Sequence, residues 1–101
     1  MVRQSALRTI RRFEIMYYLY ILKSGEDNRL YIGQTKDVEK RLLRHNLGMV
    51  KATRNRRPFE LIFCKEYVTR KDAVKIERYL KSLKGGVQFN EVLKRWGVAK
   101  W

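Results

Sequence analysis

Residues 18–45 read YLYILKSGEDNRLYIGQTKDVEKRLLRH. Tyrosine, leucine and isoleucine dominate residues 16–23, which predicts a strand. The next five residues, 24–28, are Ser-Gly-Glu-Asp-Asn, a composition typical of a tight turn. Residues 29–34 then form a return strand, so the short connection predicts a β-hairpin.

Alternation along the first strand assigns its side chains to two faces. Tyr18, Tyr20 and Leu22 share one face, and Leu19 and Ile21 share the other. Because both sets are apolar or aromatic, we expect helices to cover both sides of the sheet.

A helix is predicted after the hairpin, over residues 35–47. Thr35 is the expected N-cap, Val38 and Leu42 form the core-facing stripe one turn apart, and Gly48 ends the helix.

The second half of the chain supplies a third strand and two more helices. Pro58 closes a basic loop and residues 59–67 read as a strand. Thr69 caps the next helix, which the Gly85-Gly86 pair ends, and residues 87–96 form the last helix. The apolar positions at helical spacing in these two helices are Ala73, Ile76, Leu80, Leu83, Phe89, Val92, Leu93 and Trp96.

The chain has 101 residues, which favours a single packed domain. We assign this domain to residues 16–96, a flexible basic N-terminal extension to residues 1–15 and a C-terminal tail to residues 97–101. The extension faintly resembles a mitochondrial presequence, but it fits equally well as an upstream addition before a natural start at Met16.

Cys64 is the single cysteine and is expected to be a small core residue. Because one cysteine allows no disulfide within the chain, a reducing compartment such as the bacterial cytoplasm is expected.

The charge balance restricts the partners of this protein. Twenty-four Lys and Arg residues oppose ten Asp and Glu residues, for a net charge of +14. Such an excess usually reflects a polyanionic partner, and nucleic acid fits best. A membrane surface is a weaker fit, because no run approaches the ~18 apolar residues of a spanning helix.

Glu77 is the acidic residue with the most unusual position. It lies inside the apolar stripe of its own helix, where a carboxylate is expensive unless it is paired or binds a metal. Two readings stay open, a metal ligand or a helix-surface ion pair with Lys81 at i+4.

Arg41 and His45 are four residues apart and so share one helix face. Arginine can bind a phosphate with two parallel hydrogen bonds, and histidine can donate to a phosphate or act as an acid or base near neutral pH. The alternatives are a solvated arginine paired with Asp37 and a histidine at the boundary of the core.

Tyr20 and Tyr31 are expected to meet across the hairpin, either as a stabilising aromatic pair or as hydroxyls that orient or deprotonate a water. Gly33 is either a strand-end or bulge residue or a point where the backbone closely approaches a ligand. The residues expected to contact nucleic-acid phosphates are basic and follow one another along the helix and the loop behind it: Lys40, Arg44, Lys51, Arg54, Arg56 and Arg57.

Together these motifs resemble the GIY-YIG nuclease superfamily, and specifically its small, stand-alone, single-domain bacterial members. The first half-motif departs from the family pattern, with Tyr18-Leu19-Tyr20 in place of Gly-Ile-Tyr, whereas Tyr31-Ile32-Gly33 is intact. The ordered positions of Arg41, His45 and Glu77 complete the resemblance, which covers about residues 16–95.

The resemblance implies an α/β (α+β) fold in which a three-stranded antiparallel sheet is flanked by helices, in the order strand, strand, helix, strand, helix, helix. It also implies metal-dependent hydrolysis of phosphodiester bonds in nucleic acid, usually DNA. Glu77 would then hold a divalent cation, Mg2+ or Mn2+, Arg41 would clamp the scissile phosphate, and His45 would assist. Tyr20 or Tyr31 would orient or activate the attacking water.

Three functions compete at this point. The first is a metal-dependent endonuclease, with a preference for DNA structure and a role in repair or recombination. The second is a non-catalytic nucleic-acid-binding module with the same fold. The third, a basic structural or ribosome-associated protein, explains the charge but assigns no role to Glu77.

Overall fold

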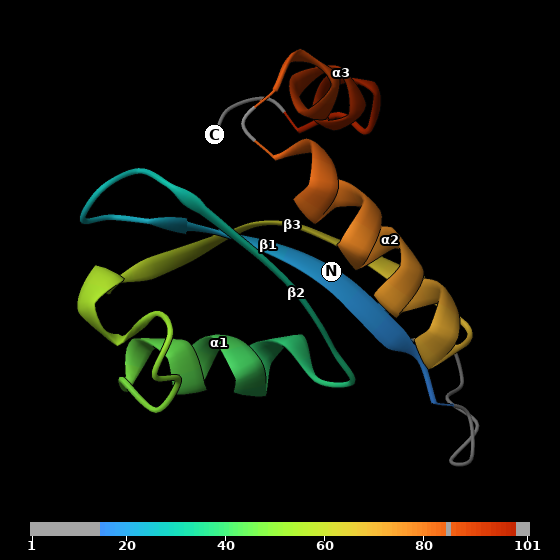
Figure 1. Ribbon diagram of the computed structural model, residues 1–101. Helices are drawn as coiled ribbons and strands as arrows, with labels where there is room; N and C mark the ends of the chain where they lie inside the picture. Colours follow the sequence, from blue (N-terminus) through green and yellow to red (C-terminus); the bar gives the residue numbers. More distant parts are fainter. Residues whose placement is uncertain (1–14, 85, 99–101) are drawn as a thin grey trace.

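The computed structural model describes residues 15–84 and 86–98 (Figure 1). The elements follow the order predicted from the sequence: β1 (Tyr17–Ser24), β2 (Leu30–Thr35), α1 (Val38–Asn46), the short 3-10 helix η2 (Arg54–Arg56), β3 (Phe59–Tyr67), α2 (Arg70–Leu83) and α3 (Val87–Arg95).

The three strands form one antiparallel sheet in the order β2-β1-β3. The predicted hairpin is confirmed, and β1 lies at the centre. Residue pairing runs from Tyr18 opposite Thr35 to Lys23 opposite Leu30. The β1–β3 pairing contains a register irregularity between Ile21 and Leu22.

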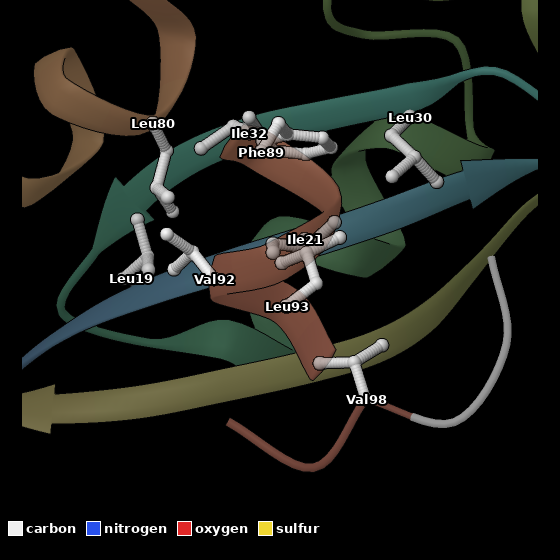
Figure 2. Packing of buried hydrophobic residues seen from close by; sticks show 9 residues of the cluster. All are labelled: Leu19, Ile21, Leu30, Ile32, Leu80, Phe89, Val92, Leu93 and Val98. Carbon is white, nitrogen blue, oxygen red and sulfur yellow. The ribbon is translucent and has the colours of Figure 1, made fainter. Parts of the chain in front are cut away.

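Helices cover both faces of the sheet, with α1 on one side and α2 and α3 on the other (Figure 1). The larger core lies on the α2/α3 side, where Leu19 and Ile21 of β1 contact residues of both helices (Figure 2). Its buried members are Leu19, Ile21, Leu30, Ile32, Leu80, Phe89, Val92, Leu93 and Val98.

The smaller core lies under α1. Tyr20 and Leu22 of β1 pack there with Phe59 of β3, and Val38 and Leu42 of α1 cover them in part. The predicted division of β1 into two faces and the predicted core stripe of α1 are therefore both confirmed.

The predicted start of α1 was wrong by two residues. Asp37 is the N-cap, and its side chain accepts a hydrogen bond from the Lys40 amide at 3.0 Å. Thr35 still belongs to β2, paired with Tyr18, and its hydroxyl accepts from the Asp37 amide. The predicted cap of α2 is confirmed, since the Thr69 hydroxyl accepts from the Asp72 amide.

Cys64 was also predicted wrongly, because its side chain is exposed. It lies on β3, an edge strand, and the apolar sequence of a strand does not show how far the neighbouring helices extend over it.

Val98 is buried in the larger core although it follows α3, so packing extends beyond residue 96, the predicted end of the domain. Residues 1–14 of the predicted extension (residues 1–15) and residues 99–101 of the predicted tail lie outside the described residues. No helix in the described part of the chain has the length and apolarity to cross a membrane.

Candidate active site

Tyr20 and Tyr31 lie side by side on the face of the sheet that α1 covers. In the β1–β2 pairing Tyr20 is opposite Gly33 and Tyr31 is opposite Leu22, so the two tyrosines are diagonal neighbours. Their ring centroids are 6.3 Å apart. The antiparallel register thus determines which two hydroxyls share this face.

Gly33 provides the space that the Tyr20 ring occupies. A Cβ atom at this position would lie 2.5 Å from the Tyr20 hydroxyl oxygen and 2.6 Å from the ring carbon that carries it. Any side chain here would therefore displace the Tyr20 hydroxyl. Gly33 does not lie at a strand end, as one sequence-based reading suggested, but inside β2.

Helix α1 brings Arg41 and His45 to the Tyr20 hydroxyl from one side. The Arg41 Nε–H donates to Tyr20 Oη at 3.3 Å, and His45 Nε2 lies 3.1 Å from the same oxygen. The i, i+4 spacing on α1 accounts for the convergence of the two groups, as the sequence predicted.

His45 is fully buried and contacts groups from four parts of the chain. Its ring centroid lies 4.9 Å from that of Tyr31 and 5.7 Å from that of Phe59. On the far side, Nδ1 lies 2.7 Å from the hydroxyl of Thr53, which is also fully buried. His45 is therefore a member of the core, and both of its ring nitrogens have a polar partner.

Burial and neighbouring charges shift the proton equilibria of this cluster. Desolvation raises the pKa of Tyr20 to about 12, although the hydrogen bond from Arg41 opposes this rise. Desolvation and then the Arg41 charge lower the pKa of His45 to about 4. The hydrogen bond to Tyr20 raises the pKa of Arg41. At neutral pH the cluster thus holds a protonated phenol, a neutral imidazole and a guanidinium cation.

The depressed pKa of His45 predicts a loss of stability in mild acid. The titratable, charged and hydroxyl-bearing groups around its ring are Tyr20 and Tyr31 from the sheet, Arg41 from α1 and Thr53. Between about pH 6.5 and pH 4 the unfolded chain binds a proton at this histidine that the folded chain does not. The free energy of unfolding should therefore fall as the pH is lowered through this range, by up to about 3 kcal/mol for this group.

Urea unfolding at a series of pH values measures that slope, and the NMR shift of the imidazole Cε1 proton reports the group directly, since the chain has one histidine. A folded-state midpoint near 6.5 would contradict the prediction.

Glu77 lies on α2, in the helical layer on the other side of the sheet from α1. Its carboxylate forms an ion pair with Lys81 Nζ at 2.8 Å, and its side chain is 17% exposed. The predicted i, i+4 ion pair is therefore present. The carboxylate is also near enough to the cluster for its charge to add to the rise in the pKa of Tyr20 that burial and Tyr31 produce.

The basic residues predicted to bind phosphate differ in their surroundings. Lys40 and Lys51 are exposed, and Arg44 is partly so. Arg54 and Arg57 are exposed as well, and their Nε atoms donate to the carbonyls of Gly48 and Arg54.

Arg56 is different from the other five. Its Nε donates to Asp27 at 3.3 Å, and its guanidinium lies 5.7 Å from the centre of the Phe59 ring. These contacts tie the loop to the β1–β2 turn, and the phosphate contact predicted for Arg56 stays a prediction.

Two polar residues of this site were not singled out from the sequence. Thr53 was one polar residue among many in a basic loop, and its burial is visible only in the structure. The Asn46 side chain accepts from the Phe59 amide and donates to the Phe59 carbonyl, which joins the end of α1 to β3. The position of Asn46 directly after His45 was the one feature of the sequence that could have pointed to it.

Comparison with known proteins adds a family match to this geometry. A model of the GIY-YIG catalytic domain matches residues 16–90. A UPF0213 protein of Staphylococcus saprophyticus is 40% identical over 67 residues, which cover 65% of this chain and 80% of the relative. The UPF0213 protein YazA of Bacillus subtilis is 41% identical over 68 residues, 66% of this chain and 68% of the relative. These names state no activity.

Two further relatives come from the genus Bacillus. A UPF0213 protein of Bacillus licheniformis is 39% identical over 85 residues, 81% of this chain and 87% of the relative. The solution NMR structure of a UPF0213 protein from Bacillus halodurans is 32% identical in sequence, with a TM-score of 0.42 over 78% of this chain and 96% of that chain.

Proposed function

The chain belongs to the GIY-YIG family, and we propose that it is a metal-dependent endonuclease that hydrolyses phosphodiester bonds in DNA. The observation that carries this proposal is the buried Tyr20 hydroxyl, held between the Arg41 guanidinium and the His45 imidazole. Tyr20 and His45 are buried and Arg41 is partly buried. Burying ionisable groups together in a small domain disfavours folding unless their hydrogen bonds compensate. Such clusters are typical of sites where charge or protons move.

Each group has a role that its chemistry supports. Arg41 donates Nε–H to Tyr20 and also interacts with Tyr31, and its guanidinium is proposed to bind a phosphate and to stabilise the charge that develops on it. Tyr20 or Tyr31 orients or activates the attacking water. His45 is neutral at pH 7 and assists through its hydrogen bond with the Tyr20 hydroxyl.

Glu77 is the residue that would hold a divalent cation. Among residues 15–84 and 86–98, no three His, Cys, Asp or Glu side chains are grouped to hold a metal. One carboxylate nevertheless suits Mg2+ or Mn2+, because Mg2+ usually keeps several waters and completes its shell with substrate phosphates. A bound cation would neutralise charge on the phosphate, and Lys81 would have to give up its ion pair with Glu77.

The exposed cations on α1 and the loop behind it are proposed to hold the nucleic-acid backbone. Lys40, Arg44, Lys51, Arg54 and Arg57 belong to the α1 side of the sheet, as does the Tyr20 cluster. Contacts of this kind position a protein without reading the base sequence. We therefore expect selection of DNA structure, such as a flap, nick or branch, which fits a role in repair or recombination. Cleavage restricted to one base sequence would contradict this expectation.

The second candidate function is a nucleic-acid-binding module without catalysis. The observation that favours it is the Glu77–Lys81 ion pair, which satisfies the carboxylate within the protein. Both candidates predict binding that weakens as salt rises, so binding does not separate them.

A cleavage assay separates them. Labelled single-stranded, duplex, flap and branched DNA, with an RNA control, would be incubated with the protein in Mg2+, in Mn2+ and in EDTA. We expect cutting that needs the metal and that falls about 10²-fold in Arg41→Ala, the loss typical for one removed donor to a transition-state charge. Arg95→Ala is the matched control, because Arg95 is an exposed arginine on α3, in the other layer.

Binding with no cutting of any substrate by the unmodified protein would favour the non-catalytic module. Equal cutting by both arginine variants would refute the role proposed for Arg41.

A further inference from the structure

We propose that Thr53 is a positioning residue: its hydroxyl holds the His45 imidazole in the tautomer that is protonated at Nδ1, so that Nε2 can accept a hydrogen bond from the Tyr20 hydroxyl. This inference deepens the proposed function and rests on it for its catalytic meaning. It also connects the basic loop to the cluster, since Thr53 is part of that loop.

The position of Thr53 suits this role. It lies between α1 and β3, directly before η2, and is fully buried although the neighbouring Ala52 and Arg54 are exposed. Backbone hydrogen bonds hold it there, from its amide to the Val50 carbonyl at 3.1 Å and from the Arg56 amide to its carbonyl at 2.9 Å. The hydroxyl is thus presented to His45 by a well-bonded turn.

The hydrogen-bond partners determine which group donates and which accepts in each contact from Arg41 through Tyr20 and His45 to Thr53. Arg41 Nε–H can only donate, so Tyr20 Oη accepts from it and has its own proton to place. Its acceptor is His45 Nε2 at 3.1 Å, which must then be unprotonated. Nδ1 therefore carries the proton of the neutral ring and donates to Thr53 Oγ1 at 2.7 Å.

The Thr53 hydroxyl closes this chain of donors and acceptors. Its own proton points toward the Val50 carbonyl, 3.4 Å away. In the opposite tautomer, Nε2–H and Arg41 would both donate to Tyr20 Oη, and the buried Tyr20 proton would lose the acceptor it has here. A buried donor left unpaired is unfavourable, so the surroundings select the Nδ1–H form.

The contact between Thr53 and His45 also connects the basic loop to the Tyr20–Arg41–His45 cluster. Lys51, Arg54 and Arg57 are the exposed cations proposed to bind phosphate, and Thr53 lies among them. A shift of this turn when the backbone of the nucleic acid binds would act on His45 through one hydroxyl. The loop would then contribute to the alignment of the site as well as to affinity.

NMR tests the tautomer without any need for activity. Long-range ¹H–¹⁵N correlation on labelled protein identifies the protonated ring nitrogen, and the signal is unambiguous because His45 is the only histidine. We expect a proton on Nδ1 in the unmodified protein and in Thr53→Ser, which keeps the hydroxyl. In Thr53→Val, which keeps the shape but loses the hydroxyl, we expect the Nε2-protonated form to become substantial.

A proton on Nε2 in the unmodified protein would overturn the proposal, and this result requires no variant to fold. An unchanged tautomer in a folded Thr53→Val protein would overturn the role of Thr53.

Kinetics test the catalytic meaning separately. We expect Thr53→Val to lower kcat about tenfold or more with little change in KM. A loss of this size is typical when a group that orients a functional side chain is removed. Thr53→Ser should restore most of the lost kcat. A loss confined to KM would show that Thr53 serves only to bind nucleic acid through the loop. If the unmodified protein cuts nothing, the proposed function fails, while the tautomer measurement still decides the positioning role.

Discussion

Replacement of Glu77 by glutamine should lower metal-dependent cleavage by about 10³-fold or more and leave DNA affinity nearly unchanged. The substitution keeps the shape of the side chain and removes the charge that would hold the cation. A metal that neutralises charge on a phosphate contributes several kcal/mol to the reaction, which corresponds to a rate factor of about this size. Affinity should persist because the exposed cations of α1 and its loop do not depend on Glu77.

Two control variants sharpen this prediction. Glu91→Gln removes an exposed carboxylate from α3 and should leave cleavage unchanged. Lys81→Gln removes the ion-pair partner of Glu77, at a stability cost of about 1 kcal/mol or less because Lys81 is half exposed. If Lys81 competes with the cation, this variant should reach full activity at a lower Mg2+ concentration.

The quantities to measure are the single-turnover cleavage rate against Mg2+ concentration and the DNA affinity at constant salt. Unchanged cleavage by Glu77→Gln would remove Glu77 from the site.

Replacement of Gly33 by alanine should lower cleavage by about 10²–10³-fold and destabilise the fold by about 1–3 kcal/mol. The added methyl group would lie 2.5 Å from the Tyr20 hydroxyl oxygen, so the ring has to move. The hydroxyl would then lose its alignment with both Arg41 and His45, and a displacement of about 1 Å in a reacting group is enough for a loss of about 10²-fold. The stability loss is the usual one for an overpacked core.

A double-mutant cycle identifies the cause of that loss. Tyr20→Leu removes the ring carbon and the hydroxyl that the new methyl group would meet. If the clash with Tyr20 is responsible, Gly33→Ala should destabilise the Tyr20→Leu background much less than the unmodified protein. Urea unfolding of the four proteins measures the coupling. Additive losses would show that Gly33 is needed for the strand itself and not for the tyrosine.

Most of the fold could be predicted from local patterns. Alternation of Leu19 and Ile21 with Tyr20 and Leu22 identified a central strand with two apolar faces, and helical spacing identified the cores of α2 and α3. The helix caps were harder. Thr35 and Asp37 are both good capping residues, and the choice between them depended on how far β2 extended through its pairing with β1.

The candidate site could be predicted only in part. The sequence motifs pointed to Tyr20, Tyr31, Arg41, His45 and Glu77, and the structure brings the first four into contact on one face of the sheet. Glu77 is placed in the opposite layer and pairs with Lys81, which the spacing alone allowed as an alternative. The roles of all five residues remain proposals, which the Glu77, Gly33, Arg41 and Thr53 variants test.

The sequence by itself determined the order of the elements, the two faces of the hairpin and the family, because each of these follows from residue spacing within one element or one short motif. Only the tertiary structure decided the exposure of Cys64, the internal contacts of Arg56 and the burial of Thr53 against His45. These features depend on how far one element extends over another and on which groups meet across a loop. Local periodicity carries no information about such distances, so packing alone determines which polar groups are buried and which partners they find.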